Sequence, residues 1–212
     1  MSWSEVTTLV AAALLLLLWW VWVAASRLDR LHRKVSASRA ALDTQLVRRA
    51  SAAAELAASG LLDPVSSVLL AEASWAALSA GAHGRAELVQ VLPDLSEAVA
   101  PPRSAGPGDL LDRDQAESEL SRTARAALAE PDDVRELRED PTGDDLVQAL
   151  ADAWYRVQLS RRFHNEAVAQ TQRMRRKVAV RLLRLHGNAR MPTTVEIDDT
   201  WPDSLARPGE SR

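Results

Sequence analysis

The side chains with the greatest capacity for metal or acid–base chemistry are the histidines, and their surroundings form no known site. The chain has four of them, at His32, His83, His164 and His186. A di-iron centre in a helical bundle needs a glutamate three residues before a histidine, and none of the four has one. The zinc-protease pattern His-Glu-x-x-His is also missing. We therefore predict no metal and no cofactor, and interpret His164, on an apolar helical stripe, as a core or interface histidine.

Nucleophilic and phosphate-binding motifs are missing as well. The sequence has no cysteine, which excludes a thiol nucleophile, a disulfide framework and a cysteine-ligated metal site. No serine lies in a Gly-x-Ser-x-Gly elbow, and residues 106–108 lack the strand and lysine of a phosphate-binding loop. Three acidic pairs are interpreted as solvated loop carboxylates: Asp132-Asp133, Asp144-Asp145 and Asp198-Asp199. We predict no catalytic residues, no small-molecule substrate and no enzymatic activity. A pocket in which ionisable residues converge would make an enzyme a candidate again.

The composition of the elements that would position these side chains predicts an all-α protein. The 212 residues suffice for one domain plus an anchor, or for two small domains. Alanine, leucine, arginine and glutamate favour helices, and the chain has a single Phe and a single Tyr. The formal net charge of −3 does not suggest a nucleic-acid partner.

The N-terminal segment has the length and composition of a transmembrane helix. Residues 6–25 carry no charge, and a helix of that length, at ~1.5 Å per residue, covers about 30 Å, the thickness of a hydrocarbon core. Trp3 precedes this run, and three further tryptophans near its end suit the membrane interface: Trp19, Trp20 and Trp22. We predict an anchor at residues 6–25, with residues 1–5 outside the cytoplasm.

Two other interpretations of this segment stay open. A buried helix of a soluble protein would not need so long an unbroken apolar run. A cleaved signal peptide would use the small residues at 23–25 as its cleavage site. However, the residues before the run carry no basic side chain, and the apolar region is long for a signal peptide. An uncleaved anchor is therefore favoured.

The charges on either side of the span predict its orientation. Only Glu5 precedes it, and Asp29 is the one acid within residues 27–39. The basic residues of that stretch are Arg27, Arg30, Arg33, Lys34 and Arg39. The positive-inside rule places them in the cytoplasm, so we predict a single-pass protein of the cell membrane with a cytoplasmic body. Because these residues can contact anionic headgroups, membrane lipid is a predicted partner.

Helical periodicity predicts four helices behind the span. The first continues from the span and ends before Gly60, a C-cap candidate, and Asp63-Pro64 has the pattern of a new helix start. Gly81 and Gly84 are expected to interrupt the second helix. The predicted ranges are 26–59, 64–80 with a shorter piece at 85–92, 110–129 and 144–186.

The predicted fold is an elongated, antiparallel up-down bundle of about four helices over residues 26–190, although a count of three stays open. Mobile loops are expected at 101–108 and 131–143, where prolines and glycines gather. Residues 191–212 form an acidic, partly disordered tail, within which residues 193–197 could be extended. Arg49 falls on the apolar stripe of the first helix and is an irregularity there.

Charge is strongly partitioned along the chain. Net charge is +5 over residues 27–49, −9 over 109–152 and +9 over 156–190. An acidic third helix packed beside a basic fourth would neutralise both. The alternative is that the basic end of the fourth helix returns to the membrane and holds the bundle against anionic lipid. That cluster comprises Arg173, Arg175, Arg176, Lys177, Arg181 and Arg184.

Two stretches resemble the LemA family of bacterial membrane-anchored helical proteins. Residues 40–49 read Ala-Ala-Leu-Asp-Thr-Gln-Leu-Val-Arg-Arg, with the acid, the Gln-Leu pair and the basic doublet of that family. Residues 161–168 read Arg-Arg-Phe-His-Asn-Glu-Ala-Val, in which Arg161, Asn165 and Val168 match the family's Arg-x-x-Tyr-Asn-x-x-Val. His164 replaces the usual Tyr, and the family's apolar Pro-Asn stretch after the basic doublet is missing.

The resemblance implies an antiparallel helical bundle behind one span, with no established enzymatic role. It singles out Arg48, Arg49, Arg161 and Asn165. We interpret them as hydrogen-bonding residues between the first and last helices, in preference to a partner-binding role. The expected function is a non-enzymatic, membrane-tethered scaffold that binds a protein partner or self-associates. The alternative is a membrane-surface or envelope component that acts on anionic lipid through its basic helix ends.

Overall fold

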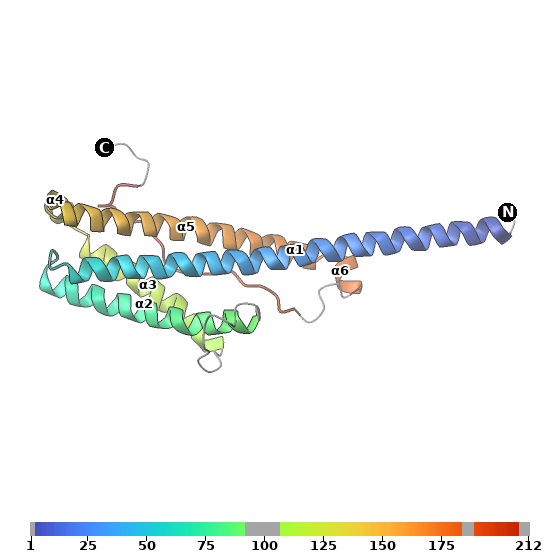
Figure 1. Cartoon of the computed structure of the whole chain (residues 1–212), viewed down its shortest axis with the longest axis horizontal. Helices are drawn as coiled ribbons and strands as arrows, with labels where there is room; N and C mark the ends of the chain where they lie inside the picture. The colour runs from blue at the N-terminus through green and yellow to red at the C-terminus, as the bar shows by residue number, and fades with distance from the viewer. Residues whose placement is uncertain (1–2, 92–106, 184–188, 208–212) are drawn as a thin grey trace. The chain divides into compact units, whose positions relative to one another are not determined.

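The computed structural model describes residues 3–91, 107–183 and 189–207, and within these ranges the fold is all-α, as predicted (Figure 1). Its helices are α1 (Trp3–Ala58), α2 (Pro64–Val91), α3 (Pro107–Ala127), α4 (Pro131–Glu139), α5 (Pro141–Arg175) and α6 (Val178–Leu182). The chain divides into two compact units. Unit 1 comprises Met1–Ser38 and Phe163–Thr194, and unit 2 comprises Arg39–Arg162 and Val195–Arg212.

Helix α1 contains the predicted apolar segment and continues without a break into the first helix of the bundle. Its best 18-residue window has a mean hydropathy of 2.3, and only 6% of that window is buried. Among the described residues it is the one helix long and apolar enough to cross a membrane, a property that an N-terminal signal sequence would share. The prediction of a long apolar N-terminal helix is confirmed.

The turn between α1 and α2 follows the predicted capping chemistry. Gly60 has φ +74°, the left-handed conformation that glycine adopts without strain. Asp63 caps α2, because its Oδ1 accepts hydrogen bonds from the Val65 and Ser66 amides at 3.0 Å each. Pro64 occupies the first helical position, where its missing N–H costs nothing.

Three predicted boundaries are wrong. Helix α2 continues through Gly81 and Gly84 to Val91, so the glycines do not interrupt it. Residues 131–139 of the expected loop 131–143 form α4, which starts with a proline and carries acids in its first turn. The fourth long helix ends at Arg175 rather than near residue 186, and the short α6 follows it. Most of the other expected loop, residues 101–106, lies outside the described ranges.

Unit 2 is a helical bundle with its own apolar core. The second half of α1 runs alongside α2, α3 and the first part of α5 (Figure 1). The main apolar cluster of unit 2 includes Leu56, Leu70, Leu120, Leu150 and Trp154, and α4 contributes Val134 and Leu137. Gly143 lets α5 start close to α4, because a Cβ there would lie 2.0 Å from the Leu137 carbonyl oxygen.

Unit 1 pairs the first part of α1 with the last part of α5 in antiparallel fashion. Lys34 Nζ donates to Gln170 Oε1 at 3.4 Å, and Ser38 Oγ lies 3.1 Å from His164 Nδ1. Nearer the N-terminus, Leu28 shares a buried cluster with Met174 and Val180. Because α5 residue numbers rise as those of α1 fall, the last long helix returns along α1.

The C-terminal tail is extended and packs on unit 2. Val195 and Ile197 are buried against Leu42, Leu46 and Val157. Trp201 and Leu205 join the main core at 8% and 4% exposure. This part of the predicted tail is therefore packed as far as Leu205, while 208–212 lie outside the described ranges.

Candidate functional site

Arg49, the irregular residue of the apolar stripe, is fully buried at the junction of three helices of unit 2. Its Nη2 lies 2.8 Å from Glu117 Oε2 and donates to the Glu117 carbonyl at 3.1 Å, while its Nη1 donates to Ser121 Oγ at 2.9 Å. The guanidinium carbon lies 5.2 Å from the centroid of the Trp154 ring on α5. A buried cation needs such partners, because burial without them is very costly.

A second buried ion pair joins the same two helices. Arg113 Nη1 of α3 lies 2.9 Å from Asp43 Oδ1 of α1, and both side chains are almost wholly buried. Arg39 Nε approaches the same carboxylate oxygen at 3.4 Å. Half-buried Asp114 beside this pair has its pKa raised, chiefly because burial disfavours its charged form.

These two buried clusters can position helices but offer no acid–base chemistry. Each guanidinium faces a carboxylate, and an arginine does not deprotonate in proteins. Glu117 of α3 pairs with Arg49 of α1 rather than with a basic residue of α5, so the predicted neutralisation between the third and fourth helices is wrong for Glu117. Arg49 does contact α5, through the Trp154 ring rather than by a hydrogen bond.

The four residues of the LemA-like motifs do not form one site. Arg48 is exposed on α1, whereas its neighbour Arg49 is buried, and Asn165 is half-buried on α5. Arg161 binds Asp199 of the tail in bidentate fashion, with Nε–Oδ2 2.7 Å and Nη2–Oδ1 2.9 Å. The predicted hydrogen bonds between the first and last helices are therefore wrong for both Arg49 and Arg161.

Residues 195–205 form what we call the C-terminal strap, which the sequence placed in a loosely ordered tail. Beside the Arg161–Asp199 pair, Arg125 of α3 binds Asp198 with Nη2–Oδ2 2.6 Å and Nη1–Oδ1 3.0 Å. The Asp199 carbonyl accepts from Trp154 Nε1 at 3.2 Å and from Gln158 at 2.6 Å. Arg125 holds the pKa of Asp198 well below its ordinary value.

The prediction that Asp198 and Asp199 are solvated is therefore wrong. The sequence did contain a signal for the strap, because Val195 and Ile197 alternate with acids in the period of an extended segment. The hydrogen-bonding partners of Asp198 and Asp199 were not readable from the sequence, since they lie about 40 to 80 positions away in the chain.

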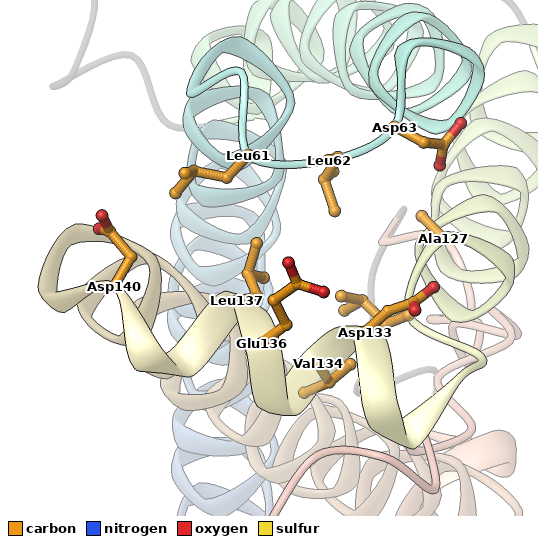
Figure 2. A pocket seen from close by; sticks show the side chains of 10 residues that line it. Leu61, Leu62, Asp63, Ala127, Asp133, Val134, Glu136, Leu137 and Asp140 are labelled. Carbon is orange, nitrogen blue, oxygen red and sulfur yellow. The ribbon is translucent and has the colours of Figure 1, made fainter.

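A cavity of about 440 Å³ opens at the end of unit 2 where α1 turns into α2. Its lining combines apolar side chains, among them Leu62 and Leu137, with the acidic residues Asp63, Asp133, Glu136 and Asp140. Figure 2 shows the side chains of Leu62 and Glu136 pointing into the space from opposite sides.

The ionisable groups that line this cavity are all carboxylates. Two of them already cap helices: Asp63 caps α2, and Asp140 Oδ1 accepts from the Thr142 and Gly143 amides at 2.8 and 3.0 Å. The hydrogen bonds from Ser66 keep the pKa of Asp63 below its ordinary value. A lining of carboxylates and apolar side chains suits a cationic amphipathic side chain better than it suits bond-making chemistry. Within the described residues, no group of three metal-binding side chains occurs.

The predicted membrane-interface residues of unit 1 are exposed. Trp3 has 91% of its surface exposed, and Trp19, Trp20 and Trp22 have 45–67%. Arg27, Arg30, Arg33 and Lys34 are exposed too, and Arg33 pairs with Asp29.

The basic cluster of the sequence is only partly a surface cluster. Arg173, Arg176, Lys177 and Arg181 are exposed. Arg175 is buried instead, and donates to the carbonyls of Arg190 at 2.6 Å and Ala189 at 2.9 Å. Arg184 lies outside the described ranges.

The apolar residues beside this cluster lie past the end of α5, within the range 144–186 predicted as one helix. Val178 and Leu182 are each 79% exposed, and Leu183 is 44% exposed. The chain turns at Arg176 and Lys177, so α6 begins in a new register and buries Val180 instead. Neither a proline nor a glycine marks this break in the sequence.

Comparison with known protein families, curated proteins and solved structures finds no match to the chain.

Proposed function

We propose that this chain is a non-enzymatic, membrane-tethered helical scaffold that serves as a protein-interaction module. The observation that carries the proposal is the change of character within α1. Its first part exposes a run of large apolar side chains that water would not favour, and its second part is a core helix of unit 2. One helix therefore contributes both the proposed anchor and part of the folded body.

The chain is further proposed to be a divergent relative of the LemA family. Support comes from residues 40–49 and 161–168, and from the order of an apolar N-terminal helix segment followed by antiparallel helices. The bacterial origin and the lack of enzymatic activity that this relationship implies are parts of the same proposal.

The proposed topology has the N-terminus outside and the body in the cytoplasm, because exposed basic residues follow the span. A reporter active only in the cytoplasm, fused to the C-terminus of the full chain, tests it together with cell fractionation. Reporter activity in the membrane fraction is expected. An inactive, exported fusion shortened by about 25 residues would instead identify a signal peptide.

The acidic cavity of unit 2 is the proposed partner-binding surface. A photo-crosslinking residue replacing Leu61, which lines the cavity and is 38% exposed, should give one discrete adduct in cells. The charge reversal Glu136→Arg should abolish it, since that side chain points into the cavity (Figure 2). A crosslinker at Thr44, exposed on α1 of the same unit, is the matched control. Equal adducts from both positions, unchanged by Glu136→Arg, would remove the cavity from the proposal.

A second candidate function is action on anionic lipid through the basic helix ends. The observation that favours it is the exposure of Arg173, Arg176, Lys177 and Arg181 in unit 1, the unit that also contains the candidate span. Salt-sensitive association of residues 27–212, which lack the candidate span, with anionic vesicles separates it from a purely protein-binding scaffold.

A further inference from the structure

The end of α5 and the whole of α6, residues 173–183, which we call the α6 corner, combine exposed apolar and exposed basic side chains. Val178 and Leu182 are each 79% exposed, while Val180 between them is 2% exposed. Four basic side chains lie exposed in the same stretch: Arg173, Arg176, Lys177 and Arg181. A basic segment with outward aliphatic side chains is the composition of elements that lie in a membrane interface.

Contacts inside unit 1 fix where this corner lies along α1. Val180 shares a buried cluster with Leu28 and Met174, and Leu31 packs against it. Leu28 follows the last residue of the uncharged run by three positions, which is about 5 Å of helix rise. The corner is therefore attached to α1 at the cytoplasmic end of the proposed span.

Residues 189–192, which follow the corner in the chain, form hydrogen bonds with the end of α5. Buried Arg175 donates to the carbonyls of Ala189 and Arg190, and Gln172 Nε2 donates to the Pro192 carbonyl at 2.9 Å. These bonds hold the returning segment 189–192 against the last turns of α5. Val178 and Leu182 thus face outward because Val180 is buried on the opposite side of α6 and because segment 189–192 is bonded to the end of α5.

We propose that the α6 corner is a second membrane contact, in which Val178, Leu182 and Leu183 insert into the interface of an anionic bilayer. Arg173, Arg176, Lys177 and Arg181 contact the lipid headgroups. The proposal rests on the membrane anchoring proposed for α1, and it adds an inserted apolar element to the electrostatic contact considered above. Lipid fits better than an apolar protein groove, because the exposed charges of the corner are all basic and the cytoplasmic end of the proposed span lies beside them.

The cysteine-free sequence allows a clean test on the full chain. A single cysteine replacing Leu182 is labelled with a polarity-sensitive fluorophore, and the protein is reconstituted into phosphatidylcholine vesicles with and without phosphatidylglycerol. Phe163→Cys is the matched control, because Phe163 is also an exposed apolar residue of unit 1, at 60%. Its neighbour His164 contacts Ser38 of α1, so position 163 lies farther along α1 from the proposed span than the corner does. Spin-labelled acyl chains report the contact of each probe with the hydrocarbon region.

We expect the spin-labelled lipid to quench the fluorophore strongly at position 182 and weakly at position 163. Quenching at position 182 should increase when phosphatidylglycerol is present. The triple variant Arg176→Glu, Lys177→Glu, Arg181→Glu should reduce the anionic-lipid effect by about tenfold or more. Equal, weak quenching at both positions would overturn the proposal. So would a probe shielded only at high protein density, which would indicate a second copy on this surface.

Vesicle flotation of the same samples separates the two levels of the argument. Protein that floats while the Leu182 probe stays in water refutes the corner contact and leaves the anchor standing. Protein that does not float refutes the anchor and, with it, the placement of the corner at a membrane. Circular dichroism of each variant checks that the helices are intact.

Discussion

Charged side chains are usually exposed and apolar side chains buried, and the Arg49 cluster of unit 2 and the α6 corner of unit 1 depart from this in opposite ways. Unit 2 buries a charged residue, Arg49, in the middle of an apolar stripe and surrounds it with a carboxylate, a hydroxyl and an indole ring. Unit 1 exposes the aliphatic side chains of Val178 and Leu182, while Val180 between them is buried. The charge of Arg49 is paired inside the molecule, whereas Val178 and Leu182 are each 79% exposed. We infer that the first serves the fold and the second serves an interaction.

The largest effect should come from breaking the buried pair. Glu117→Ala leaves Arg49 buried without its counter-ion, and we expect a loss of about 3–5 kcal/mol in unfolding free energy. Glu119→Ala on the same helix removes the carboxylate of an exposed pair with Arg122, and should cost at most about 1 kcal/mol. Urea denaturation of the full chain in mild detergent, followed by circular dichroism, measures both. Similar costs for the two variants would show that the Arg49 cluster is not a structural centre.

The strap should give the next largest effect. Trp201→Ala removes an indole that is 8% exposed and whose Nε1 donates to the Leu205 carbonyl at 2.7 Å. We expect a loss of about 3 kcal/mol, with earlier proteolysis of the C-terminus. Trp75→Ala is the control, since Trp75 is 73% exposed on α2, and its effect should stay within about 0.5 kcal/mol. A strap that is loosely held would make the two tryptophan variants alike in denaturation and proteolysis.

Much of this arrangement was predictable, and the failures share a physical cause. Gly60, Asp63 and Pro64 predicted the end of α1 and the start of α2, because caps depend on residues only a few positions apart. The partners of Arg49 and of the strap come from distant parts of the chain, so local patterns could not reveal them. The break at Arg176 and Lys177 depends on Val180 and Arg175 finding buried partners, which no proline or glycine signalled.

The acid-dependent stability of unit 2 should have two contributions of opposite sign. Arg125 lowers the native pKa of Asp198, so this pair stabilises the fold above the unfolded value of about 3.9, and the contribution is lost as pH falls below it. Burial raises the native pKa of Asp114, so its ionised form disfavours folding near neutrality and its protonation at lower pH restores stability. Denaturation midpoints between pH 3 and 7 measure both.

Two amide variants separate these contributions. Asp198→Asn should lower stability at pH 7 and flatten the decline toward pH 3. Asp114→Asn should raise stability at pH 7 and leave the acid decline in place. If both variants gave the pH profile of the unchanged chain, neither carboxyl would be linked to folding.

The smallest effect on stability should come from substituting an exposed apolar residue of the α6 corner. This substitution tests most directly whether the corner, unlike the Arg49 cluster of unit 2, is unnecessary for folding. Leu182→Ser alters a side chain that is 79% exposed, so the unfolding free energy should change by no more than about 0.5 kcal/mol. Val180→Ser, two residues away, places a hydroxyl in the cluster of Leu28 and Met174 and should cost about 2 kcal/mol. Denaturation in detergent compares the two variants. A costly Leu182→Ser would mean that this leucine is part of the core, and its exposure would no longer point to an interaction surface.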